Sequence, residues 1–317
     1  MIRLLTFFHR QKSHLLAIDI GTHSIKLMEL KLTRGRPTLS ALGSIATPAL
    51  RDGRLDEEEL VKSLTHLVDT TAVSTTEVLT AITGAKVITR QIRLPAMSDE
   101  ELAKAVLTEA QEHIPVPITD LAIRYVKLGR EQMDQAEYLN IMLIAVPTAL
   151  VEQYYHIFLM AGLKVTAMDL QAFGLWRIFG QEQISNPLAV LDIGYGHSQL
   201  VVIKDGEIKY HRGMSEGGRT LKDPVGLDNL AREVQRSLDF YQSQPGGIPV
   251  TNIILTGGGC NIPGVADYLN NSWSITTEIR VPACWNSFIQ DQPSLMQYDP
   301  SYAMALGLLL REVPSNV

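Results

Sequence analysis

Two stretches of the chain share one pattern of hydrophobic and polar positions. An apolar run at residues 15–18 ends in Asp19, and after a turn a second apolar run covers residues 25–32. The pattern returns at residues 188–203, where Asp192 takes the place of Asp19. Short apolar runs bounded by turn residues are typical of buried strands. The sequence therefore predicts two strand–turn–strand hairpins, 192 − 19 = 173 residues apart, in two related halves.

The residues of these turns suit a bound anion. Glycine lets the backbone approach a ligand, turn amides and hydroxyls donate to phosphate oxygens, and a carboxylate can hold a hydrated divalent cation. One such hairpin is weak evidence, because Asp-Ile-Gly also occurs in ordinary hairpins. A third element, residues 252–264, is a strand that runs into three glycines and a helix start, which suits a base and ribose lying on bare backbone. Together the three elements predict a nucleotide site.

Between the hairpins the pattern predicts an inserted module. Its expected elements are a strand at 87–94, a helix from the capping box at 98–101 to about 113, strands at 121–128 and 138–146 joined by a polar loop at 129–137, a helix ending near 162 and a strand at 163–168. This strand–helix–strand–strand–helix–strand order is that of a split βαβ module.

The remaining segments predict the helices that cover two sheets. Helical spacing of apolar residues predicts helices from Asp56, at 169–179, at about 227–243 and at 302–310. Residues 219–226 are expected to be irregular, because Pro224 interrupts the expected helix start. Residues 284–298 are expected to form a loop.

Composition narrows the classes of protein. A chain of 317 residues with 45% hydrophobic and 20% charged residues is typical of a soluble globular protein of about two lobes. A net charge of −6 without a basic stripe argues against nucleic-acid binding. Two cysteines give no metal-binding or redox pair, and no apolar run approaches the ~20 residues of a membrane-spanning helix. The basic, apolar residues 1–12 could lie on an anionic membrane or pack on the protein body.

Four further stretches carry a resemblance to a known family. They are residues 87–95 (VITRQIRLP), residues 99–117 with DEEL and EAQEHIPVP, residues 237–241 (SLDFY) and residues 257–264 (GGGCNIPG). With the two hairpins, they resemble the PilM family, the actin-like proteins of type IV pilus assembly, which is itself similar to the cell-division protein FtsA. The resemblance covers about residues 14–311.

The resemblance implies an α/β, actin-like ATPase fold of two duplicated lobes with an inserted split βαβ module in the first. The first lobe would be residues 14–85, completed by about 168–185 and a C-terminal helix at 300–313. The inserted, partner-binding subdomain would be residues 86–167, and the second lobe residues 186–299.

The resemblance also implies ATP with Mg²⁺ as ligand. Carried over residue by residue, the binding residues would be Asp19, Gly21, Thr22, Ser24, Lys26, Asp192, Gly194, His197, Ser198, Gly217, Gly218, Gly257, Gly258 and Gly259. Asp19 and Asp192 would hold the Mg²⁺ through water, and Gln171 stands where actin-like enzymes keep a water-orienting side chain.

The implied partner is the N-terminal cytoplasmic peptide of a PilN-type inner-membrane protein, bound by a homo-oligomeric ring that is cytoplasmic and peripheral at the inner membrane. His23 and His197 stand where small or hydroxyl residues are more usual in the family, and Tyr195 adds bulk beside the second turn. Because only Gln171 is placed to orient a water, ATP binding with slow or no hydrolysis is expected. A sugar-type kinase of the same superfamily and an FtsA-like membrane tether are the alternatives.

Overall fold

The computed structural model describes most of the chain, namely residues 12–49, 56–82, 87–133, 136–180, 186–244, 246–289 and 297–313. Apart from Lys12, the basic N-terminal segment lies outside these residues.

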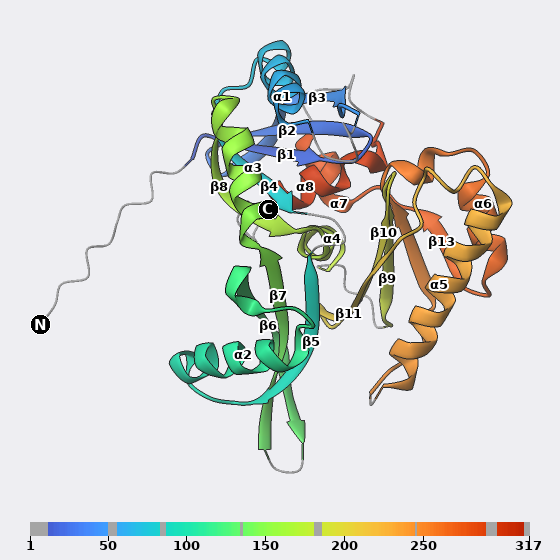
Figure 1. The fold of residues 1–317 in the computed structure, drawn as a ribbon. Helices are drawn as coiled ribbons and strands as arrows, with labels where there is room; N and C mark the ends of the chain where they lie inside the picture. Colours follow the sequence, from blue (N-terminus) through green and yellow to red (C-terminus); the bar gives the residue numbers. More distant parts are fainter. Residues whose placement is uncertain are drawn as a thin grey trace, which may run out of the picture.

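The first lobe is built on a five-stranded sheet in the order β3-β2-β1-β4-β8 (Figure 1). Strand β1 (His14–Ile20) is buried over almost its whole length and pairs antiparallel with β2 (Ser24–Thr33) and parallel with β4 (Glu77–Ile82). The other members of this lobe are β3 (Arg36–Ala46), α1 (Glu57–Thr71), α3 (Thr148–Met160) and β8 (Lys164–Leu170). Asp56 caps α1, which buries Leu60, Leu64 and Leu67.

The second lobe repeats this topology. Its sheet has the order β11-β10-β9-β12-β13, in which β9 pairs antiparallel with β10 and parallel with β12, as β1 does with β2 and β4. Its elements are β9 (Leu188–Ile193), β10 (Ser198–Lys204), β11 (Glu207–Met214), α5 (Pro224–Ser243), β12 (Asn252–Thr256), α6 (Val265–Ser272) and β13 (Thr276–Ile279). The sequence repeat is therefore a structural duplication.

Two local predictions for the second lobe were wrong. Pro224 does not interrupt the helix but starts it at the first position, after the N-cap Asp223, where the missing N–H of proline costs nothing. Residues 284–298 are not all loop, because the chain forms α7 (Ala283–Phe288) there, which packs against β3 and buries Trp285 and Phe288 in the core of the first lobe.

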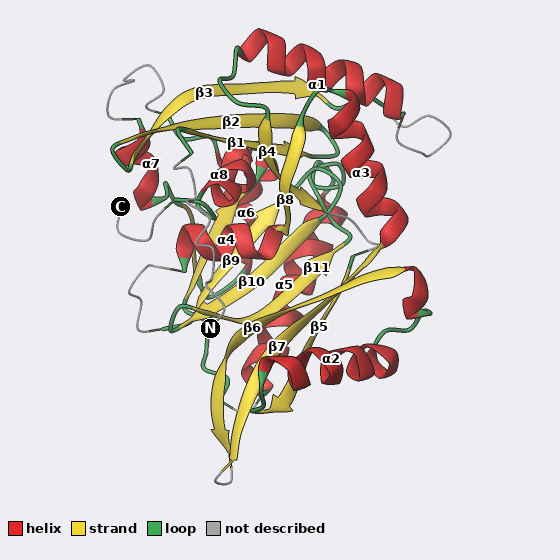
Figure 2. Ribbon diagram, turned by 90° about the vertical axis from the view of Figure 1, so that its left-hand side faces the viewer, coloured by secondary structure: helices red, strands yellow, loops and turns green. Residues whose placement is uncertain are grey.

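The inserted module is a three-stranded sheet covered by one helix. Strands β5 (Ile88–Pro95), β7 (Ala136–Pro147) and β6 (Leu121–Met133) lie side by side in that order, with α2 (Asp99–His113) on one face (Figure 2). Ser98 and Glu101 form the predicted capping box of α2. The module has its own apolar core, which includes Leu102, Val106 and Ile141.

Two predictions about this module were wrong. Strand β8 does not complete it but pairs in parallel with β4 in the first lobe, so we place the end of the module at β7 rather than at residue 167. The predicted loop at 129–137 is mostly strand, since β6 runs to Met133 and β7 begins at Ala136.

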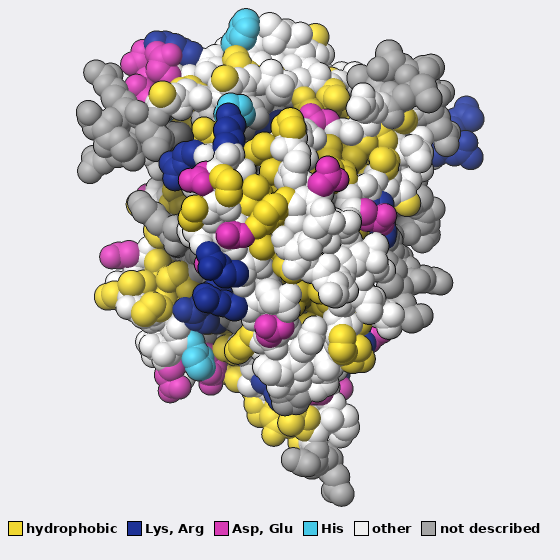
Figure 3. All heavy atoms as spheres, turned by 90° about the vertical axis from the view of Figure 1, so that its right-hand side faces the viewer, with side chains coloured by type: hydrophobic (Ala, Val, Ile, Leu, Met, Phe, Trp, Pro, Cys, Tyr) yellow, Lys and Arg dark blue, Asp and Glu magenta, His cyan; other side chains and the backbone are white. Residues whose placement is uncertain are grey.

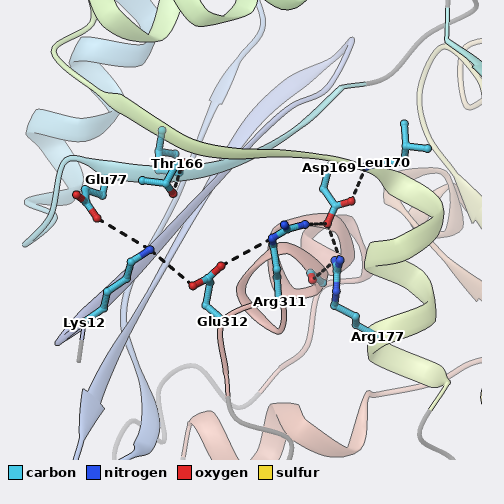
Figure 4. Close-up of polar contacts among 10 residues, drawn as sticks. Lys12, Glu77, Thr166, Asp169, Leu170, Arg177, Arg311 and Glu312 are labelled. Atoms are coloured by element: carbon cyan, nitrogen blue, oxygen red, sulfur yellow. Dashed lines mark hydrogen bonds and ion pairs between the residues drawn. The ribbon is translucent and has the colours of Figure 1, made fainter. Parts of the chain in front are cut away.

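Two short helices lie at the centre of the molecule, α4 (Gln171–Phe179) directly after β8 and α8 (Ala303–Leu309) against β1, β2 and β4. They cross so closely that a Cβ on Gly307 would lie 2.5 Å from the Cα of Gly174. Asp169, two residues before α4, accepts hydrogen bonds from Arg177 (2.6 Å) and Arg311 (3.2 Å), as Figure 4 shows. Through these hydrogen bonds, Asp169 joins the chain just before α4 to the last turn of α4 and to the segment that follows α8.

Candidate functional site

A cleft of about 630 Å³ lies between the two lobes. Its wall includes thirteen of the fifteen residues predicted for the site: Asp19, Gly21, Thr22, Ser24, Lys26, Gln171, Asp192, Gly194, His197, Gly218, Gly257, Gly258 and Gly259. Segments far apart in the sequence thus meet in one place, while their role in binding stays a prediction.

The turns of the two hairpins face each other across the cleft. The His23 and Tyr195 rings are 4.7 Å apart, and a Cβ on Gly196 would lie 3.0 Å from the Thr22 hydroxyl. His23 and Tyr195, two of the departures from the family pattern, therefore form one contact between the two turns.

The first turn is anchored from behind. The Thr47 hydroxyl donates to the Gly21 carbonyl (2.6 Å), and the Thr47 amide donates to the His23 carbonyl (2.9 Å). Lys26 lies beside the turn, with its Nζ 3.5 Å from the Ser24 carbonyl. An ordered turn with an adjacent cation is a suitable binding place for phosphate oxygens.

Asp19 is the most unusual group of the cleft. It is 5% exposed, and its Oδ1 is buried without a hydrogen-bond partner among the described residues. Burial raises the pKa of this carboxyl to about 6, nearby Lys26 opposes the shift, and Asp192 adds to it. A buried carboxylate oxygen without a donor suits a hydrated divalent cation, which would remove the cost of its burial.

Asp192 has the same position in the second lobe and a different environment. Burial raises the pKa of its carboxyl, while a hydrogen bond from Gln199 and the nearby His197 and Lys26 lower it. The Gln199 Nε2 donates to Asp192 Oδ2 (3.1 Å) and also to Gln171 Oε1 (3.0 Å). The two carboxylates could hold Mg²⁺ between the lobes, with Asp19 offering the open oxygen.

Strand register explains why Ser198 does not line the cleft. Ser198 pairs with Ile193, as Ile25 pairs with Ile20, so the counterpart of Ser24 is His197. The Ser198 hydroxyl is buried and donates to the Glu216 carbonyl (2.7 Å). The prediction that it faces the ligand was wrong, because successive side chains of a strand point to opposite faces.

Gln199 is a residue that the sequence reasoning missed. It pairs with Asp192 as Lys26 pairs with Asp19, seven residues after the aspartate in each lobe. That equal spacing is the signal that would have identified it.

The glycines have different roles. A Cβ on Gly259 would lie 2.2 Å from the Ile193 side chain, so glycine is required there for packing against the end of β9. Gly257 has φ +85°, a backbone conformation that other residues rarely adopt. A Cβ on Gly258 would meet only the Ser301 Cβ, at an ordinary 3.6 Å, so this position faces open space. Gly217 lies behind the second turn, where a Cβ would collide with the His197 amide nitrogen at 2.6 Å.

The cleft also includes polar residues that were not among the predicted site residues: Ser44, Lys222, Asn261, Asp299, Ser301 and Tyr302. Asp299 accepts hydrogen bonds from the Asn261 side chain and from the Ser301 amide (both 2.9 Å). It thereby connects the segment that follows the three glycines 257–259, called the glycine shelf below, to the segment that leads into α8. The Asp-Pro-Ser capping pattern was the sequence signal for this segment.

The similarities to known proteins concern the family and the fold of this chain. The profile of the family described as "Type IV pilus assembly protein PilM" matches residues 17–226 and 226–313. A solved PilM-PilN type IV pilus biogenesis complex superimposes with a TM-score of 0.84 at 25% identity, over 96% of this chain and 99% of that chain.

Two further solved structures show a shared fold. One is the ethanolamine utilization protein EutJ from Carboxydothermus hydrogenoformans, with a TM-score of 0.55 at 14% identity over 94% of this chain and 90% of that chain. The other is the cytoplasmic domain of EpsL, an inner-membrane component of the type II secretion system of Vibrio cholerae, with a TM-score of 0.51 at 13% identity over 95% and 92%. The predicted actin-like fold is confirmed.

Proposed function

Since the chain belongs to the type IV pilus assembly protein PilM family, we propose that it is an ATP-binding scaffold of the pilus machine that docks a PilN-type partner. ATP with Mg²⁺ would bind in the cleft between the lobes, and the inserted module together with α3 would receive the N-terminal segment of the partner. Binding of such a segment would hold a ring of copies at the cytoplasmic face of the inner membrane. No helix among the described residues has the length and apolar character to cross a membrane.

The observation that supports nucleotide binding is the buried Asp19 oxygen without a partner, beside Lys26 and opposite Asp192. Two facing turns can hold the phosphates, and the bare backbone at Gly258 leaves room for the nucleoside. When bound, Mg²⁺ would neutralise the phosphate charge next to the two carboxylates.

The partner surface is supported by the distribution of exposed apolar side chains. Of the twelve large hydrophobic side chains that are exposed in the described part of the chain, six lie between residues 107 and 160: Leu107, Val116, Val126, Tyr155, Leu159 and Met160. Leu107, Val116 and Val126 belong to the inserted module, whereas Tyr155, Leu159 and Met160 lie within two turns of α3. Exposed apolar side chains that lie close together, as these three do on α3, mark interaction sites more often than isolated ones do. The 25% identical relative was solved as a complex of PilM with PilN, so a PilN-type peptide is the occupant that we propose.

Nucleotide binding is tested by thermal unfolding with and without ATP and Mg²⁺. A ligand that binds only the folded protein raises its melting temperature. Asp19→Ala should abolish this rise, whereas Asp267→Ala, which removes an exposed carboxylate of α6, should keep it. An equal rise in Asp19→Ala and the unchanged protein would exclude the cleft as the site.

Partner docking is tested by calorimetric titration with a PilN-type N-terminal peptide. Leu159→Glu on α3 places a charge on the proposed surface and should remove binding. Phe240→Glu is the matched control, because Phe240 is equally exposed (54% against 55%) but lies on α5 of the second lobe. Figure 3 shows the face on that side, where hydrophobic and charged side chains are interspersed. Equal binding by both variants would exclude the α3 surface.

A further inference from the structure

Gln171 has a fixed place at the wall of the cleft. It is the first residue of α4, and the ion pairs of Asp169 hold the end of β8 to Arg177 and Arg311 (Figure 4). The Leu170 amide also donates to Asp169 (2.9 Å). The backbone that carries Gln171 is therefore anchored, and only rotation of its side chain could change the atom that it presents to a ligand.

The hydrogen bonds around Gln171 determine which way its amide faces. Asp192 offers carboxylate oxygens, so the Gln199 atom 3.1 Å from Oδ2 must be the NH₂ nitrogen. The second proton of that NH₂ points to Gln171, 3.0 Å away, so the Gln171 atom on that side must be the carbonyl oxygen. The Asp192 carboxylate thus determines the orientation of the Gln199 amide, and the Gln199 amide determines that of the Gln171 amide.

The carbonyl oxygen of Gln171 has a second neighbour. His197 Nε2 lies 3.4 Å from the same oxygen and can donate in the Nε2–H tautomer. In this tautomer, Gln199 and His197 would together occupy both lone pairs of the carbonyl. The Gln171 Nε2 has no hydrogen-bond partner among the described residues and is not among their buried unsatisfied atoms, so it is the part of the amide open to the cleft.

A donor at this position suits a different task from orienting water. A group that activates an attacking water must accept one of its protons, and the occupied Gln171 carbonyl does not offer that acceptor. An NH₂ group donates to the oxygens of a terminal phosphate, which are the feature that distinguishes ATP from ADP.

We propose that Gln171 binds the terminal phosphate of ATP as a donor and that Gln199 is the positioning residue that fixes its amide. The inference rests on the proposed nucleotide site. On this inference the cleft distinguishes ATP from ADP and retains ATP, because the Gln171 carbonyl that would accept a proton from an attacking water points away from the cleft.

The first test is Gln171→Leu, with ATP and ADP affinities measured separately and hydrolysis followed in a single turnover. A lost donor to a charged oxygen should weaken ATP by roughly tenfold to 100-fold and leave ADP unchanged. Unchanged ATP affinity with lost hydrolysis would overturn the inference, because it would mark Gln171 as a water-orienting residue. A wild-type protein that binds neither nucleotide would instead overturn the proposed function.

The second test separates positioning from a structural role. Gln199→Met removes the donor at similar size and frees the Gln171 carbonyl to turn to the cleft, so the preference for ATP over ADP should fall by roughly tenfold and single-turnover hydrolysis should rise. Gln199→Lys keeps a donor, as Lys26 does in the first lobe, and should retain more of the preference than Gln199→Met. Equal preference and hydrolysis in the wild type and Gln199→Met would overturn the positioning role. If Gln199→Met does not fold, the Gln171→Leu result decides.

Discussion

The two lobes have the same strand order and the same aspartate, and they differ seven residues further along the hairpin. In the first lobe that position is Lys26, and Asp19 keeps a buried oxygen without a partner. In the second lobe it is Gln199, which donates to Asp192 and to Gln171. In the site that we propose, the same backbone would therefore have two tasks. The first hairpin would offer charge to a cation and a phosphate, and Gln199 of the second hairpin donates to the amide oxygen of Gln171.

The two turns have the same backbone geometry next to their first glycine. A Cβ on Gly21 would lie 2.9 Å from the Ser24 carbonyl, and a Cβ on Gly194 would lie 2.7 Å from the His197 carbonyl. Both turns therefore need glycine at the same place. The difference between the lobes lies in side chains that reach the cleft, which is where substitutions can separate the two tasks.

The largest expected effect comes from the aspartates. Asp19→Asn should weaken binding of ATP with Mg²⁺ by several kcal/mol, or more than roughly 100-fold in Kd, because the open oxygen loses its charge. Asp192→Asn should weaken it less, since Gln199 already satisfies one oxygen of that carboxylate. Titration calorimetry measures both constants. An equal or larger loss in Asp192→Asn would remove the assigned difference between the hairpins.

The next effect is on stability in the absence of nucleotide and Mg²⁺. Since the pKa of Asp19 rises from 3.8 to about 6 on folding, the folded protein keeps a proton that the unfolded chain releases. Stability relative to Asp19→Asn should therefore fall as pH rises from about 4 to about 7, by up to about 3 kcal/mol. Urea unfolding of both proteins at pH 4.5 and pH 7.5 measures this difference. A difference that does not change with pH would contradict the raised pKa.

The glycine shelf of the second lobe allows a comparison within three residues. Gly258→Val should fold normally and weaken ATP by roughly tenfold to 100-fold, about 1.4 to 2.7 kcal/mol, because its side chain enters the cleft. Gly259→Val should instead lower the melting temperature, since its side chain collides with Ile193. Thermal unfolding and titration together separate the two outcomes. Normal ATP affinity in a folded Gly258→Val protein would place the nucleoside elsewhere.

The smallest expected effect is Lys26→Gln, which gives the first hairpin the residue type of the second. Loss of one cation near the phosphates should weaken ATP by at most roughly tenfold and raise the pKa of Asp19 further, because Lys26 now lowers it. Binding measured at 50 mM and 300 mM salt should show a weaker salt dependence than in the wild type. An unchanged affinity and salt dependence would show that Lys26 points its charge away from the ligand.

By itself, the sequence determined the elements whose signals are local. Apolar runs bounded by turn residues predicted both hairpins, and the apolar pattern between them predicted the strands of the module. The capping box of α2 and the apolar face of α5 followed from residue spacing alone. The thirteen predicted residues that line one cleft were carried over from the family resemblance, and all but Gln171 lie in or beside the two hairpin turns and the glycine pairs and runs of the second lobe.

Only the tertiary structure decided the pairing of β8 with β4 and the orientation of the Gln171 amide. Strand β8 begins 82 residues after the end of its partner β4. The sequence of a short strand does not indicate which edge of which sheet it will pair with. The direction of the amide depends on Asp192 and Gln199, which a different lobe brings within hydrogen-bond distance of α4. Such features are not encoded in a local pattern, because their energy exists only when distant segments are already in contact.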